Sequence, residues 1–291
     1  MAGGAQISML ADGRRLHLHH GPIDLVVEGF GERAEIDAAY RQASAVFPAI
    51  LPRLVEELPC LRRASRPGDR DLFEGPVARR MAAAAVPHSA AHFVTPMAAV
   101  AGAVADEVLA AMCAGPALSR AYVNNGGDIA FHLAPGASLT AGLIGDYFAP
   151  SVDGACRLSH DMPVRGIATS GWKGRSFSLG IADAVTVLAR DAAAADVAAT
   201  LIANAVNADH PAVRRAPADS IDLDSDLGAR EVTVAVGALD PDTVAVALES
   251  GMRCAKGMVT AGQVVAAVLV LQQEIRVVGV PPDTLIAAHA A

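Results

Sequence analysis

Aromatic residues and positive charge are both scarce in this sequence. Aromatic side chains make up 4% of the 291 residues, and 23 lysines and arginines stand against 31 acidic residues, which gives a net charge of −8. Proteins that bind nucleic acids depend on a basic surface. The composition therefore disfavours a nucleic-acid-binding function, while the hydrophobic fraction of 53% is ample for a large core.

Paired cysteines and long apolar runs are also missing. The four cysteines are widely spaced and form no CxxC pair, which predicts reduced thiols and argues against a disulfide framework or a zinc site: Cys60, Cys113, Cys156 and Cys254. No apolar stretch is long enough to span a bilayer, since residues 264–271 are too few. The first fifteen residues contain no apolar segment of a secretory signal, so we expect a cytoplasmic protein that contacts no membrane.

Several familiar site motifs are absent. The sequence contains no P-loop, no GxGxxG motif after a strand and no GxSxG nucleophile turn. The acidic run at residues 222–226 begins like a calcium loop, but Leu227 stands where that loop needs glycine. His17 and His19 share one face of a predicted strand, yet no carboxylate or cysteine at ligand spacing accompanies them, which argues against a metal site.

Strands are predicted in clusters, with long helices between the clusters. The predicted strands are residues 15–20, 23–28, 120–123, 129–133, 139–144, 164–169, 176–179, 184–189, 232–236, 264–271 and 274–278. The predicted helices are residues 35–47 with a second short helix to residue 58, then 77–85, 96–113, 192–206 and 241–251, with caps at Thr95, Asp191 and Asp240. Residues 62–75 and 207–230 are predicted loops, and the tail from residue 281 is expected to fray. This order predicts an α+β fold with largely antiparallel sheets, as a single domain over residues 1–291.

The sequence Tyr-Val-Asn-Asn-Gly-Gly-Asp-Ile-Ala at residues 122–130 places two glycines between strand-like runs. Glycine tolerates positive φ and lets another backbone or a ligand come close. One interpretation is a tight hairpin with Asn and Asp in the turn, and the other is a ligand-binding loop. The motif by itself favours the hairpin.

A polar stripe runs along the predicted helix at residues 192–206. Asp196, Thr200, Asn204 and Asn207 lie at i, i+4, i+8 and i+11, so they share one side of the helix. Asp196 and Thr200, one turn apart, can present oxygens to a hard cation such as Mg²⁺. The alternative, which the stripe alone favours, is the solvated face of an amphipathic helix.

Two further segments are rich in small residues. Residues 166–171, Gly-Ile-Ala-Thr-Ser-Gly, predict a turn after a strand, and its N–H groups could hold a phosphate unless it is an ordinary loop. Residues 95–106 would let another backbone or a flat ligand approach, and close helix packing explains them equally well.

In this order, the motifs resemble the ApbE family of flavin transferases, closest to a non-exported branch related to it. A small-residue helix ending in Asp106 precedes the motif at residues 124–129, and an Ala-Thr-Ser-Gly segment follows at residues 168–171. A Val-Thr-Val strand then leads into a helix that carries Asp196 and Thr200. The resemblance covers about residues 93–206 and implies an ApbE-like α/β roll with largely antiparallel sheets and packed helices.

Enzymes of the ApbE family bind FAD and Mg²⁺, move FMN onto a Thr or Ser hydroxyl of an acceptor protein, and release AMP. The resemblance implies that Asp196, Thr200 and a backbone oxygen near Ala98 bind the metal. It also implies that eight residues line the flavin-nucleotide site: Asn125, Gly126, Gly127, Asp128, Ala168, Thr169, Ser170 and Gly171. This chemistry suits those residue types, because cleaving a pyrophosphate mainly needs Mg²⁺ on the phosphate oxygens and correct positioning.

Two departures from the family pattern bear on activity. The family has a His and an Asp-Pro-x-Thr-Gly element before the Val-Thr-Val strand, whereas residues 172–182 contain no His and no Pro, and Ala101 replaces a common lysine. We therefore expect a protein that binds a flavin nucleotide and a divalent metal, with a transferase-like or pyrophosphate-cleaving activity whose catalytic residues are unassigned. The alternatives are a non-catalytic flavin or nucleotide carrier and a structural protein with an empty cleft.

Overall fold

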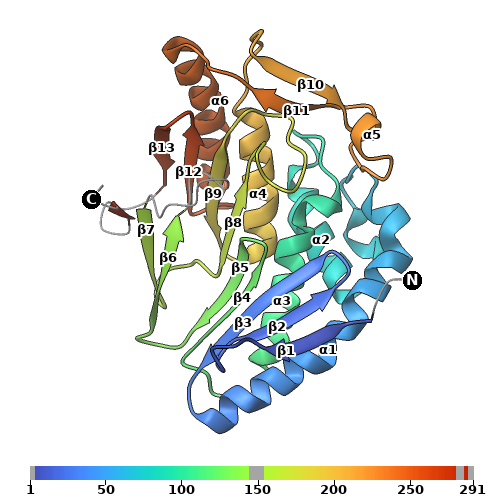
Figure 1. Ribbon diagram of the computed structural model, residues 1–291, viewed down its shortest axis with the longest axis vertical. Helices are drawn as coiled ribbons and strands as arrows, with labels where there is room; N and C mark the ends of the chain where they lie inside the picture. The colour runs from blue at the N-terminus through green and yellow to red at the C-terminus, as the bar shows by residue number, and fades with distance from the viewer. Residues whose placement is uncertain (1–3, 144–153, 280–284, 288–291) are drawn as a thin grey trace. The chain divides into compact units, whose positions relative to one another are not determined.

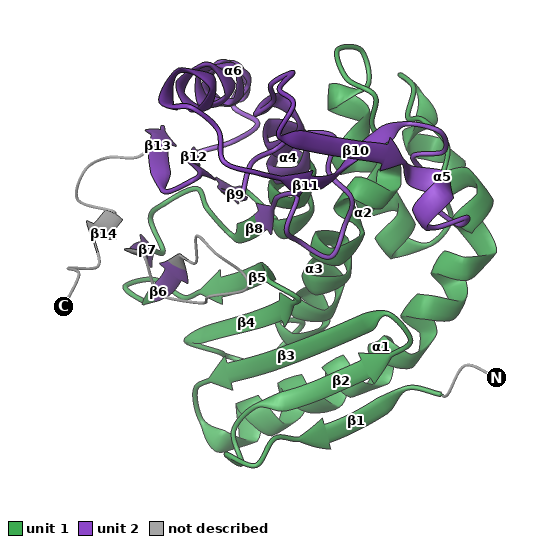
Figure 2. Cartoon of the chain, turned by 45° about the horizontal axis from the view of Figure 1, so that its top comes forward, with its two compact units in different colours: residues 1–139, 159–168, 190–197 green, residues 140–158, 169–189, 198–291 purple. Residues whose placement is uncertain are grey.

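The computed structural model describes residues 4–143, 154–279 and 285–287 (Figure 1). The chain divides into two compact units, drawn green and purple in Figure 2. Unit 1 comprises residues 1–139, 159–168 and 190–197, and unit 2 comprises residues 140–158, 169–189 and 198–291. Strand β8 (Gly166–Ser170) and helix α4 (Ala192–Ala205) each begin in unit 1 and end in unit 2. The single domain over residues 1–291 stays a prediction.

Unit 1 contains a run of antiparallel strands in the order β1-β2-β3-β4-β5, followed by the start of β8. The strands are β1 (Gln6–Met9), β2 (Leu16–His20), β3 (Ile23–Phe30), β4 (Arg120–Asn125) and β5 (Asp128–Leu133). Every second side chain of β2 and β4 is buried, because successive side chains of a strand point to opposite faces. The predicted hairpin between β2 and β3 is confirmed.

Unit 1 also contains helices, two of which pack against this sheet. The helices are α1 (Arg33–Leu61), α2 (Pro76–Ala85) and α3 (Val100–Met112), with short 3₁₀ helices η1 (Asp69–Leu72), η2 (Val86–His88) and η3 (Pro96–Ala99). Helix α1 contacts β2 and β3, and α3 contacts β4 and β5 (Figure 2). Thr95 stands at the predicted helix start, but its side chain makes no capping hydrogen bond.

Helix α1 runs without a break for 29 residues, whereas two shorter helices were expected. Pro48, Pro52 and Pro59 lie inside it and are all exposed, so the carbonyl groups that lack a donor because of Pro48 and Pro52 face water. Phe47 and Leu54 are buried on the opposite side. Burial of that apolar face outweighs the helix-breaking tendency of the prolines.

Unit 2 contains strands in the order β8-β9-β12-β13. The strands after β8 are β9 (Ala184–Ala189), β12 (Ala266–Leu271) and β13 (Glu274–Val278). A second sheet pairs β10 (Val213–Pro217) with β11 (Glu231–Val236), and a third has the order β14-β7-β6, with β6 (Ser138–Leu143), β7 (Gly154–Ser159) and β14 (Leu285–Ala287). Every strand pair of defined register is antiparallel, which confirms the α+β fold with largely antiparallel sheets.

Helix α6 (Pro241–Thr260) begins where it was expected and ends later. Asp240 caps it by accepting the N–H of Thr243 at 2.9 Å, which confirms the predicted cap. The predicted end at Gly251 is wrong, because this glycine serves packing. A Cβ there would lie 2.3 Å from Cγ2 of Val206.

Other differences fall in unit 2 and at the first strand. Residues 207–230 are not a loop throughout, since they contain β10 and helix α5 (Ala218–Ile221), and residues 176–179 form no strand. Strands β1 and β7 were not predicted, and β1 is exposed at all four residues, so it lacks the buried alternation that identifies a strand. Residue 144 of a predicted strand and most of the tail from residue 281 lie outside the described residues.

Candidate functional site

The two glycines at residues 126 and 127 form the turn of a hairpin between β4 and β5. Asn125 pairs with Asp128 across it, and Gly126 and Gly127 have φ of +64° and +111°. The N–H of Gly127 donates to Oδ1 of Asn124 at 2.8 Å. The predicted hairpin is confirmed, and the positive φ values explain why both positions are glycine.

Asn125 ties this turn to the beginning of α3. Its side chain is buried, and Nδ2 donates a hydrogen bond to the carbonyl oxygen of Ala101 at 3.0 Å. A buried amide of this kind fixes the position of the turn, because leaving it unpaired would cost about 1–3 kcal/mol. Asp128, on the other side of the turn, is therefore held beside α3.

Asp196 of α4 lies half-buried against the same part of α3. Its Oδ2 accepts the N–H of Gly102, with 3.0 Å between nitrogen and oxygen. Burial and the charge of Asp128 raise the pKa of Asp196 well above its ordinary value, while the N–H groups of Gly102 and Ala101 act in the opposite direction. Two carboxylates from different segments thus lie close enough to repel each other.

Ala98 lies in η3, immediately before α3. In a continuous α-helix its carbonyl would receive the N–H of Gly102, four residues later. That N–H is directed to Asp196. Ala98 is half-buried, and a contact of its carbonyl with a metal stays a prediction.

Two other aspartates hold the beginning of α4. Asp106 accepts the N–H groups of Ala192 and Ala193 at 3.1 and 2.9 Å, and Asp191 accepts that of Ala194 at 2.7 Å, which confirms the predicted cap. Negative charge is favourable at a helix N-terminus. Even so, burial raises the pKa of Asp106 to about 6.

Close packing explains small residues around this site. A Cβ at Gly102 would lie 2.2 Å from the carbonyl oxygen of Ala192, and one at Gly166 would lie 2.1 Å from the carbonyl carbon of Asp191. Neither backbone can accept a side chain there. The helix-packing interpretation of residues 95–106 therefore applies at Gly102.

The rest of the polar stripe on α4 belongs to unit 2. Oδ1 of Asn204 accepts the N–H of Leu179 at 2.9 Å, and Nδ2 of Asn207 donates to the Leu179 carbonyl at 3.1 Å. Thr200 is half-buried, and among the described residues its hydroxyl has no hydrogen-bond partner. The interpretation of the stripe as a solvated face is therefore wrong at Asp196 and Asn204.

The Ala-Thr-Ser-Gly segment ends a strand, as predicted at residues 164–169, and the predicted turn is wrong as far as Ser170. Ala168, Thr169 and Ser170 end β8, and only Gly171 lies beyond it. Oγ1 of Thr169 lies 2.8 Å from Oγ1 of Thr186 on β9. A Cβ at Gly171 would lie 2.4 Å from the carbonyl oxygen of Asp183, so this glycine also permits a close backbone approach. Whether these residues line the nucleotide site stays a prediction.

The segment after Gly171 folds back on Asp183. Nε1 of Trp172 donates to Oδ1 of Asp183 at 3.1 Å, and Nζ of Lys173 lies 3.2 Å from the same oxygen. Residues 172–182 contain neither histidine nor a carboxylate. This loop therefore offers no ordinary general base.

His17 and His19 have a carboxylate neighbour that sequence spacing did not indicate. Asp24 of β3 lies 3.1 Å from Nε2 of His17 and 3.2 Å from Nδ1 of His19. Strand pairing brings it there, because His19 is directly opposite Asp24. In the part of the chain that the structure describes, no group of three or more His, Cys, Asp or Glu residues could hold a metal ion.

A family model described as "AbpE bacteria" matches residues 7–277. The chain belongs to this family. The match confirms the resemblance seen in the order of the short motifs, and it extends well beyond them on both sides. No helix among the described residues is long and apolar enough to cross a membrane.

Relatives of this AbpE-family chain include several archaeal proteins. A UPF0280 protein of Methanopyrus kandleri is 40% identical over 155 residues, covering 52% of this chain and 58% of that protein. A UPF0280 protein of Methanosphaerula palustris is 37% identical over 178 residues, covering 60% and 70%. The chain spans only 54% and 50% of two other such relatives, from Methanothrix thermoacetophila and Methanothermobacter thermautotrophicus.

Among solved structures, the chain is similar to the apo flavinyl transferase ApbE of Pseudomonas stutzeri. The sequences are 12% identical, 95% of each chain is covered, and the TM-score is 0.42. The flavin transferase ApbE of Vibrio cholerae, in a mutant form, matches with 12% identity and a TM-score of 0.38, covering 94% of this chain and 96% of that one.

Proposed function

We propose that this protein binds a flavin nucleotide, FAD or a close relative, together with Mg²⁺, and that the carboxylates of Asp128 and Asp196 bind the metal. Membership of the family supports the choice of ligand, because the motifs that carry the resemblance are those that contact FAD and metal in ApbE enzymes. The observation that carries the proposal is that Asp196 and the hairpin of Asp128 both bond to the start of α3, through Gly102 and through Asn125 to Ala101. Burial and the charge of Asp128 raise the pKa of Asp196 there.

The donor atoms suit Mg²⁺, which prefers oxygen ligands. Two carboxylates held close together repel each other, and a divalent cation between them would remove that cost. The carbonyl of Ala98 and the hydroxyl of Thr200 would add neutral oxygens, and both residues are half-buried rather than sealed in the core. Bound Mg²⁺ would neutralise phosphate oxygens of the nucleotide and retain several waters.

The hairpin residues Asn125, Gly126, Gly127 and Asp128 would meet the nucleotide. The exposed glycines leave open space, since a Cβ at Gly127 would have no atom within 4 Å. Asn125 would hold the turn in place through its bond to Ala101. From the family motif we extend the same role to Ala168, Thr169, Ser170 and Gly171.

We further propose that transfer of FMN to a protein acceptor is slow. A positioned general base typically contributes about 10²–10⁴-fold, and residues 172–182 supply none. His160 is a poor substitute because of its position, since its Nδ1 bonds to the carbonyl of Leu133 at 2.7 Å. Leu133 ends β5 and Asp128 begins it, so about 17 Å of strand separates them. A residual attack by water would release FMN and AMP.

A non-catalytic flavin carrier is the second candidate. It is favoured by the loop after Gly171, where the side chains of Trp172 and Lys173 both contact Asp183 and fix the position of the loop. Side chains bonded in this way stabilise the fold of unit 2 and do not activate the hydroxyl of an acceptor protein. Analysis of products after incubation with FAD and Mg²⁺ separates the candidates, because a carrier returns FAD unchanged.

Metal binding is tested by titrating Mg²⁺ into the FAD-loaded protein in a calorimeter. We expect Asp196→Ala to weaken Mg²⁺ binding at least about tenfold, since it removes a direct ligand, and to leave the fold intact. Asp161→Asn is the matched control, because Asp161 is an exposed carboxylate of unit 1 outside the site. Unchanged Mg²⁺ affinity in Asp196→Ala would refute the metal assignment.

Transfer is tested by incubating the protein with FAD, Mg²⁺ and an acceptor domain of the ApbE type. Covalent flavin is detected by its fluorescence on a denaturing gel. We expect little labelling, together with either slow release of AMP or none. Efficient labelling that disappears in Asp196→Ala would contradict the proposed loss of transfer while supporting the site.

A further inference from the structure

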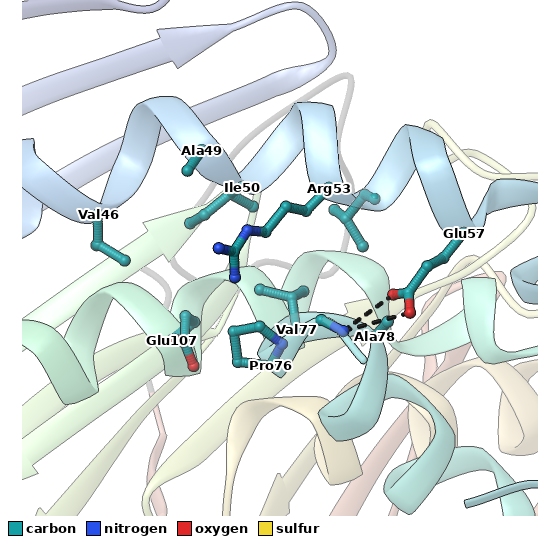
Figure 3. Close-up of a pocket in the computed structure, with 11 residues that line it drawn as sticks. Val46, Ala49, Ile50, Arg53, Glu57, Pro76, Val77, Ala78 and Glu107 are labelled. Atoms are coloured by element: carbon teal, nitrogen blue, oxygen red, sulfur yellow. Dashed lines mark hydrogen bonds between the residues drawn. The ribbon is translucent and has the colours of Figure 1, made fainter. Parts of the chain in front are cut away.

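Unit 1 contains a cavity apart from the carboxylates described above. It has a volume of about 170 Å³ and lies among α1, α2 and α3 (Figure 3). Its walls are mainly apolar and include Val46, Ile50, Leu54, Pro76 and Val77. Ala49 and Arg53 are exposed members of the lining, so the cavity opens to solvent along α1.

Three charged side chains border this cavity, and two of them have partners within the fold. Glu57 accepts the N–H groups of Glu74 and Gly75 at the start of α2, at 2.6 and 3.3 Å (Figure 3). Glu107 accepts a hydrogen bond from Nε of Arg80 at 2.9 Å.

Arg53 is the third. Figure 3 shows its guanidinium turned across the cavity, between α1 and the beginning of α2. Among the described residues no carboxylate lies within ion-pair distance of it, and it makes no hydrogen bond. The cavity thus combines an apolar interior with one guanidinium that the fold does not use.

We propose that this cavity binds a small organic monocarboxylate, whose hydrocarbon body fills the apolar chamber while its carboxylate pairs with Arg53. A guanidinium binds a carboxylate through two parallel hydrogen bonds, so the charge and shape of Arg53 match this group. A dry cavity of about 150 Å³ accepts benzene, so the chamber fits a ring or a chain of about six carbons.

The surroundings of Arg53 distinguish this ligand from a phosphate. Phosphate sites gather several N–H donors, often at a helix N-terminus. Here the N–H groups of Glu74 and Gly75, just before α2, are already bonded to Glu57, and Pro76 has none. One cation that is unpaired among the described residues, with both bordering glutamates already bonded within the fold and the walls mainly apolar, suits a singly charged amphipathic molecule.

The test uses the full chain and three isosteric probes: benzoate, benzyl alcohol and benzylamine. Binding is followed by calorimetry or by protein amide shifts in NMR. We expect saturable binding of benzoate, at least about tenfold tighter than that of benzyl alcohol, and none of benzylamine. Absence of saturable benzoate binding, or equal affinity for benzoate and the alcohol, would overturn the proposal.

Three variants locate the site. Arg53→Met should reduce benzoate affinity about tenfold and leave the affinity for benzyl alcohol unchanged. Arg41→Met is the matched control, because Arg41 is an exposed arginine of α1 outside the lining, and it should change nothing. Ala49→Phe should fill the chamber from an exposed position and abolish binding of both probes. Retention of benzoate affinity in Arg53→Met, or an equal loss in Arg41→Met, would refute the assignment.

Discussion

Both ends of α4 pack closely against glycines, but the chemistry around them differs. At its beginning, in unit 1, Gly102 faces the backbone of Ala192, and Asp106, Asp191 and Asp196 accept N–H groups there. Just beyond its end, in unit 2, Gly251 of α6 faces the side chain of Val206.

Asp106 and Asp191 occupy a helix N-terminus, where carboxylates are expected. Asp196 lies beyond the first turn of α4, and it accepts the N–H of Gly102 in the first turn of α3 instead. What distinguishes Asp196 is the nearby charge of Asp128, which adds to burial in raising its pKa well above the ordinary value. Asp128 beside it, and not a missing capping role, is therefore the reason why we assign Asp196 to the metal.

The largest effect is expected from an added methyl group at Gly102. The new Cβ would meet a carbonyl oxygen at 2.2 Å, and neither helix backbone can move aside easily, so Gly102→Ala should lower the free energy of unfolding by about 3 kcal/mol or more. Gly251→Ala should cost less, about 1–2 kcal/mol, because its neighbour Cγ2 of Val206 belongs to a side chain. Denaturant unfolding measures the loss of stability in each variant. Equal losses would show that the packing at Gly102 and the packing at Gly251 do not differ.

An intermediate, pH-dependent effect is expected at Asp106. Since its folded pKa is raised to about 6, the wild type loses stability as pH rises from about 4 to about 6, and Asp106→Asn does not. The difference in free energy of unfolding between the wild type and Asp106→Asn should thus shrink by about 2 kcal/mol over that range. Unfolding curves of both proteins at the two ends of the range measure it, and a constant difference would mean that burial does not control this carboxyl group.

The smallest effect, with the opposite sign, is expected at Gly257 in α6. A Cβ there would meet nothing within 4 Å, and φ is not positive. Gly257→Ala should raise the free energy of unfolding by about 0.5–1 kcal/mol, because alanine favours the helix. A loss of stability would show that open space alone does not predict which glycines serve packing.

Local signals predicted much of the fold. The alternation in β2 and β4, the Asn-Gly-Gly-Asp turn and the caps at Asp191 and Asp240 were all visible in the sequence. Failures arose where tertiary contacts override local preference. Gly251 resembled a helix end and is a packing contact, and Ser170 was expected in a turn and continues β8.

The sequence predicted the separate segments of the candidate site but not the contacts that join them. Sequence order indicated Asp196 and the hairpin, but not the bond between Asn125 and Ala101 or that between Asp196 and Gly102. These bonds join segments up to 94 residues apart, and no spacing rule encodes them. The cavity beside Arg53 had no sequence signal, because side chains from separate helices enclose it.

The prolines of α1 have a consequence for the order of folding. Each proline inside a helix costs about 3 kcal/mol, so residues 33–61 should be largely unstructured as an isolated peptide. The helix can form only as its apolar face is covered by β2, β3 and α3. In pulsed hydrogen exchange during refolding, the amides of α1 should therefore gain protection together with those of the strands and not before them.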